Sequence, residues 1–61
     1  MMETDLNYFR RRAHEEREAA MKAQHASARR AHRHMADRYD ELSDVIAAHH
    51  SALHRRLVSA L

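Results

Sequence analysis

A chain of 61 residues with a formal charge of +2 and no Cys, Gly or Pro forms at most one small domain, without disulfides or thiolate metal sites. Sheets depend on Gly and Pro in their turns, whereas the abundant Ala, Arg, Glu, Leu and Met favour helix, so an all-α fold is expected. The absence of Cys is compatible with a reducing compartment, and we expect a cytoplasmic protein. The longest apolar run, residues 45–48, is far shorter than a membrane span, so we expect no membrane partner.

The first predicted helix spans about residues 4–24. Thr4 can cap it through its hydroxyl, and Asp5 lies in the first turn, where the helix dipole favours an anion. An apolar stripe at helical spacing, interrupted at Glu16, consists of Leu6, Phe9, Ala13, Ala20 and Ala23. Opposite charges four residues apart, expected on the solvent side, are Arg11/Glu15, Arg12/Glu16 and Glu18/Lys22. Because the stripe is mostly Ala, it allows close helix approach but buries little area.

The second predicted helix spans about residues 27–59 and carries the stronger apolar pattern. Its members alternate by three and four residues, as in a coiled coil or bundle, and are Ala28, His32, Met35, Tyr39, Leu42, Ile46, His49 and Leu53. Carrying the first pattern forward by sevens leads to Ser27 and His34, which are polar, so the two patterns are out of phase. We therefore predict a break at about residues 25–27, with Ser27 as N-cap of the second helix. One long helix in a coiled coil is the alternative.

The predicted fold class is thus an all-α, two-helix antiparallel hairpin with a longer second helix, in a single domain over residues 1–61. The first helix covers the second only to about residue 48, which leaves an apolar overhang at residues 49–61. Because such a surface is expected to be covered, we predict a homo-oligomer, most simply a homodimer forming a four-helix bundle. The residues predicted to mediate self-association are Met35, Tyr39, Leu42, Ile46, His49, Leu53 and Leu57.

Several segments resemble a set of short α-proteobacterial proteins. They read Tyr8-Phe9-Arg10-Arg11-Arg12-Ala13, Glu15-Glu16-Arg17-Glu18-Ala19-Ala20, Ala28-Arg29-Arg30-Ala31-His32 and Met35-Ala36-Asp37-Arg38-Tyr39. These are similar to the family pattern YFRRRAxEE followed by ARxxHxxMAxRY, over about residues 6–42. The resemblance implies a helical hairpin but no activity, so it assigns no functional residue. At the break the chain reads His25-Ala26-Ser27, without the Pro or Asp that the family often has there.

Seven His are the most unusual feature of the composition. His50 and His54, one helical turn apart, form a candidate metal-binding pair, which a two-fold axis would double to four nitrogen ligands. His32 and His49 lie in the apolar pattern, where protonation would disfavour burial, so a metal- or pH-responsive helical protein is one alternative. The chain has no catalytic or nucleotide-binding motif, and we expect no enzyme and no cofactor.

Arg-rich segments make a nucleic-acid-associated protein the main rival interpretation. The candidate phosphate contacts are Arg10, Arg11, Arg12, Arg29, Arg30, Arg33, Arg55 and Arg56. Against this, acidic residues are nearly as numerous as basic ones, and only three aromatic residues are available for base stacking. The preferred prediction is a non-enzymatic, self-associating helical interaction module, with an unidentified protein as the alternative partner.

Overall fold

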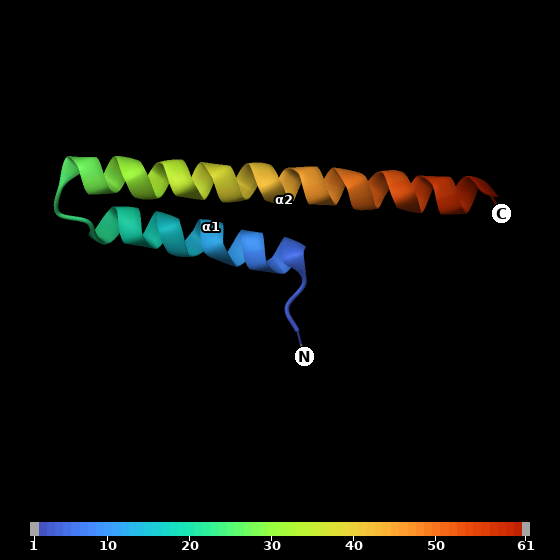
Figure 1. The fold of residues 1–61 in the computed structure, drawn as a ribbon, viewed down its shortest axis with the longest axis horizontal. Coiled ribbons are helices and arrows are strands. Elements are labelled where there is room, and N and C mark those ends of the chain that lie inside the picture. Colours follow the sequence, from blue (N-terminus) through green and yellow to red (C-terminus); the bar gives the residue numbers. More distant parts are fainter. Residues whose placement is uncertain (1, 61) are drawn as a thin grey trace.

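The computed structural model describes residues 2–60 as two antiparallel helices, α1 over Asp5–Lys22 and α2 over Ala26–Ala60 (Figure 1). No strand occurs among these residues, and the second helix is the longer one. The predicted all-α hairpin is therefore confirmed, and the alternative of one continuous helix is wrong. Met1 and Leu61, the last residue of the predicted overhang, lie outside the described residues.

α1 begins as its sequence predicts. Thr4 has an extended backbone, and its hydroxyl accepts a hydrogen bond of 3.1 Å from the amide of Asn7, which satisfies one of the free amides of the first turn. Asp5 lies in that turn and Lys22 in the last one, where each charge opposes the helix dipole. The helix stops after Lys22 because Ala23 returns to an extended conformation.

The connection between the helices occupies residues 23–25, about two residues earlier than predicted. The amide of Arg29 donates to the carbonyl of His25 at 3.0 Å, so His25 is in the N-cap position and the prediction of Ser27 as N-cap is wrong. The guanidinium of Arg29 also donates to the carbonyls of Ala23 and Gln24, at 3.0 and 3.3 Å. No described residue has a positive φ, so this turn requires no Gly.

Small side chains form the seam between the two helices. Ala13, Ala20 and Ala36 are its buried apolar residues, and Ala36 is fully enclosed. Ser43 is buried on the same face of α2, and its hydroxyl donates to the carbonyl of Tyr39 at 2.9 Å. Such a seam lets the helices pack closely but buries little apolar area, and no large side chain of residues 2–60 is fully buried.

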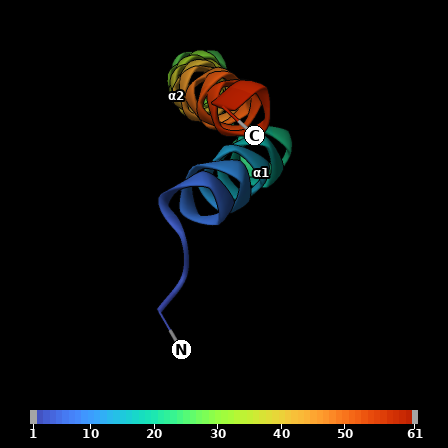
Figure 2. The ribbon, with the colours of Figure 1, turned by 90° about the vertical axis from the view of Figure 1, so that its right-hand side faces the viewer.

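The hairpin is one layer thick and elongated, as the end-on view in Figure 2 shows. Its Cα extents are 55 × 24 × 10 Å, and its radius of gyration is 15.6 Å, against about 10.5 Å for a compact domain of this length. Its accessible surface is 5200 Å², whereas a typical monomer of 7.2 kDa exposes about 4,100 Å². The isolated chain therefore exposes roughly 1,100 Å² more than a compact monomer would.

α2 continues well beyond the N-terminal end of α1 (Figure 1). The start of α1, at Thr4, Asp5 and Leu6, lines one hollow with Ile46 and His50 of α2. Residues 51–60, about 15 Å of helix, extend past this point. Neither α1 nor α2, as described, has the length and hydropathy that crossing a membrane requires.

Candidate functional site

The predicted apolar pattern of α2 divides between two faces of the helix. The members that are half-buried against α1 are His32, Tyr39 and Ile46. The members that remain exposed are Met35, Leu42, His49 and Leu53. Leu57, predicted to mediate self-association, is exposed as well because it lies past the start of α1. Because an α-helix turns by about 100° per residue, the exposed members lie about 90° around α2 from the line that faces α1. The single seam expected from the sequence is therefore two adjacent faces, of which α1 covers one.

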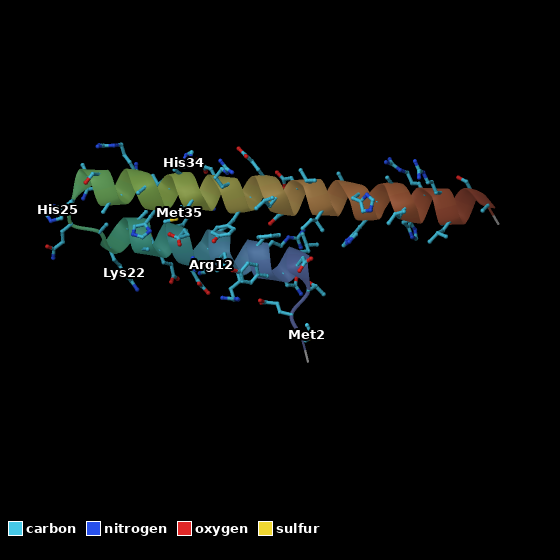
Figure 3. All side chains as sticks on the ribbon, viewed as in Figure 1. Met2, Arg12, Lys22, His25, His34 and Met35 are labelled. Atoms are coloured by element: carbon cyan, nitrogen blue, oxygen red, sulfur yellow. The ribbon has the colours of Figure 1, made fainter. Side chains whose placement is uncertain are left out.

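We call the uncovered face the outer stripe. Its large apolar side chains are Met35, Leu42, Val45, Leu53 and Leu57, which are 38–69% exposed. Met35 lies at the edge of the seam, whereas the neighbouring His34 points away from α1 (Figure 3). Sequence reasoning missed Val45, although its spacing of three from Leu42 and four from His49 fits the same helical face.

A buried carboxylate joins the two helices within the seam. Glu16 is only 6% exposed, and it accepts hydrogen bonds from Arg12 at 2.7 Å and from Nδ1 of His32 at 2.6 Å. His32 is the donor because an ionised carboxylate has no hydrogen to give. The hydrogen bond from His32, with further help from Arg12, lowers the pKa of Glu16 despite its burial. The prediction that the Arg12/Glu16 pair lies on the solvent side is wrong, since Glu16 faces α2.

Larger side chains pack where α1 begins. The ring of Tyr39 lies 6.0 Å from that of Phe9 and 6.5 Å from that of Tyr8, measured between centroids. The guanidinium carbon of Arg12 lies 5.3 Å from the Tyr39 centroid, within cation–π range. Phe9 is half-buried and Tyr8 is more exposed, so the aromatic cluster gives this end of the seam the apolar contact that its Ala residues lack.

Several of the predicted phosphate-binding Arg residues are instead paired within the chain. Arg11 bridges Glu3 at 3.0 Å and Glu15 at 2.5 Å, and Arg12 also contacts Glu15. These hydrogen bonds hold the pKa of Glu3 and of Glu15 below the usual range. Arg29 is bound to the carbonyls of the turn. The remaining candidates, which are exposed, are Arg10, Arg30, Arg33, Arg55 and Arg56.

One ion-pair cluster between the helices was not foreseen. Arg17 of α1 reaches Asp40 of α2 at 2.6 Å and Asp37 at 3.2 Å. It lies on the side of the seam opposite the outer stripe, and its partners are 20 and 23 residues away in sequence. Only the folded hairpin brings such distant charges together, because no helical spacing connects them.

The His residues remain mostly at the surface. His50 and His54 are exposed on successive turns of α2, and the rings of His49 and His50 are 6.4 Å apart. Within residues 2–60 no group of three or more His, Asp or Glu side chains is arranged to hold a metal ion. His14 contacts Glu18 at 3.0 Å.

Charge along α2 complements the outer stripe. Of the four acids within residues 37–44, Asp37 and Asp40 pair with Arg17 and Glu41 lies beside the outer stripe, whereas residues 45–60 contain no acid and carry Arg55 and Arg56. An apolar face flanked by charges of opposite sign is an arrangement that paired helices use to choose partner and orientation. The outer stripe and its flanking charges are therefore the candidate functional site. No protein-family model, curated protein or solved structure matches this chain.

Proposed function

We propose that the protein is a non-enzymatic, self-associating helical module whose outer stripe packs against a second copy to form a dimer of four helices. The observation that carries this proposal is the outer stripe itself, whose five large apolar side chains lie on one side of α2. Contiguous exposed apolar surface with a polar rim is typical of interaction sites. α1 cannot cover the stripe, because Met35, Leu42, Val45 and Leu53 lie around α2 away from the line that faces α1, and Leu57, on the line of Tyr39, lies past the start of α1.

The exposed area also supports a second copy as the partner. A stable protein interface buries about 800 Å² from each subunit. The surface that the hairpin exposes in excess of a compact monomer is somewhat larger, roughly 1,100 Å². A two-fold dimer joins the same patch on both subunits, so one apolar stripe on each chain is enough to form the interface. Dimer formation would add the large-residue contacts that the Ala-rich seam lacks.

Sedimentation of two matched variants tests this proposal. Leu53 lies in the outer stripe, whereas Val58 is 56% exposed and lies about 140° around the helix from it. We expect the native chain to sediment as a dimer at micromolar concentration. Leu53→Asp should raise the dimer dissociation constant at least about 100-fold, since it removes two buried Leu side chains and adds two charges. Val58→Asp should leave the dimer intact.

Circular dichroism of both variants provides the control, because each should keep the helix content of the native hairpin. A native chain that stays monomeric up to high concentration would refute the proposal. Equal weakening by both substitutions would also refute it, because a nonspecific charge effect would then account for the loss.

A small nucleic-acid-associated protein is the second candidate function. It is favoured by the exposed Arg30, Arg33, Arg55 and Arg56, which form no ion pair within residues 2–60. Binding of this kind must weaken steeply with salt, because it releases counterions from the phosphates. Retention on DNA or RNA columns at low and high salt distinguishes it, and no retention at low salt would exclude it.

A further inference from the structure

We infer that the two copies pair antiparallel along α2, with the two-fold axis at His49. Each overhang, residues 51–60, then lies against residues 38–47 of the other copy. This inference rests on the self-association proposed above and specifies its orientation and register. It follows from three independent features: the spacing of the outer stripe, the distribution of charge and the place where α1 begins.

The spacing of the outer stripe is symmetric about His49. Val45 lies four residues before this position and Leu53 four residues after it, so an antiparallel pair brings Val45 of one copy against Leu53 of the other. Leu42 lies seven residues before the axis and Leu57 eight after it, so these two fall within about 1.5 Å of the same level. All four side chains are exposed in the single chain, and one symmetric contact would cover them on both copies.

The charges favour the same register. Glu41 lies eight residues before His49 and Arg56 seven after it, which again places them within about 1.5 Å of one level. Glu41 lies on the flank of the stripe that faces away from α1, and Arg56 lies on the same side of His49, about 60° nearer the middle of the stripe. In an antiparallel helix pair matching sides of the two stripes meet. Both residues are exposed and lack an ion-pair partner in the described part of the chain. A parallel pair would instead place Glu41 of one copy at the level of Glu41 of the other, where like charges meet.

The start of α1 makes room for this arrangement. Thr4, Asp5 and Leu6 lie beside His49 and His50 in one hollow, so α1 begins at the level of the axis. Past that level the overhang has no α1 beside it (Figure 1). Two hairpins related by the axis therefore meet end to end at their α1 helices, and each overhang packs on the hairpin of the other copy. Full overlap of the two hairpins would leave both overhangs exposed.

Single Cys substitutions test the register directly, because the native chain contains no Cys. A disulfide forms only when the two Cα atoms come within about 4.4–6.8 Å. We expect the His49→Cys variant to form a disulfide between position 49 of one copy and position 49 of the other on mild oxidation. Val45→Cys and Leu53→Cys should not cross-link alone, since each position lies about 12 Å along the helix from the same position in the other copy. An equimolar mixture of these two should give a covalent heterodimer, and Val58→Cys, outside the stripe, should give none.

Charge exchange provides a second measurement that needs no oxidation. Glu41→Arg and Arg56→Glu should each weaken the homodimer severalfold in sedimentation equilibrium. Mixing the two variants, or combining both changes in one chain, should restore association. In a parallel dimer neither single change would weaken the homodimer, because each position would face the same position of the other copy and meet a like charge before and after the change. Homodimers of both variants as stable as the native one would therefore overturn this register.

The outcomes separate the inference from the proposed function. A dimeric native chain in which Val45→Cys and Leu53→Cys each cross-link alone is parallel, and this inference is then wrong although self-association holds. A dimer in which neither His49→Cys nor the mixture cross-links has another register, which also overturns it. A monomeric native chain refutes the proposed function itself.

Discussion

Replacing Glu16 by Ala should destabilise the hairpin more than any other change at a charged residue. Glu16 accepts one hydrogen bond from Arg12 on its own helix and one from His32 on the facing helix. Hydrogen bonds to charged groups contribute about 1.5–3 kcal/mol each. Arg12 keeps its contacts with Glu15 and Tyr39, and His32 is partly exposed and regains water. We therefore expect the free energy of unfolding to fall by about 2 kcal/mol, near the lower end of this range.

Thermal unfolding followed by circular dichroism, at one fixed protein concentration, measures this loss. For a domain of this size 1 kcal/mol corresponds to about 4–8 °C, so Tm should fall by roughly 8–16 °C. The matched control is Glu18→Ala, which removes an exposed carboxylate that contacts only His14 on the surface. That change should alter the free energy of unfolding by no more than about 0.5 kcal/mol.

The effect of Glu16→Ala should disappear in acid. The pKa of Glu16 is lowered in the folded chain, chiefly by the hydrogen bond from His32. Its stabilising contribution is therefore complete above the ordinary value of 4.5 and is lost as the pH falls through the lower, folded pKa. Equal stability of the native chain and the variant at neutral pH, or a difference unchanged in strong acid, would refute this assignment.

Two further substitutions test the packing of the seam. Ala36→Leu should lower the free energy of unfolding by about 1–3 kcal/mol, because a fully enclosed Ala leaves no room for a larger side chain. The control, Ala48→Leu on the exposed face, should change it by less than about 0.5 kcal/mol. Thermal melts compare the two, and equal stability would mean that the helices do not pack closely. Tyr39→Ala should cost about 2–3 kcal/mol in urea unfolding, since it removes the ring stacked on Phe9, and an unchanged midpoint would contradict a stabilising role for this cluster.

The sequence was sufficient for the helical hairpin because the determinants are local or compositional. The lack of Gly and Pro and the abundance of helix-forming residues exclude a small sheet protein. Thr4 and Asp5 mark the start of α1 through interactions within one turn of helix. The change of phase between the two apolar patterns predicted the break to within about two residues. Its position was missed because the Arg29 side chain binds the carbonyls of the turn, which no local capping rule anticipates.

The candidate site was less accessible from the sequence. Leu42 and Leu53 belong to the periodic apolar residues of the sequence, but periodicity alone does not reveal which neighbouring face α1 occupies. The pair Arg12 and Glu16 has the spacing of a surface ion pair, so its burial could not be foreseen without His32 from the other helix.

The sequence by itself therefore determined that the chain is helical, where its first helix starts and that its second helix carries more apolar surface than the first can cover. Those properties depend on neighbours within a few residues along the chain. Only the tertiary structure decided which part of that surface is covered, because contacts such as those of Glu16 with His32 and of Arg17 with Asp40 join residues far apart in sequence. These contacts fix the rotation of α2 against α1, and that rotation leaves Leu42, Val45 and Leu53 exposed on the outer stripe.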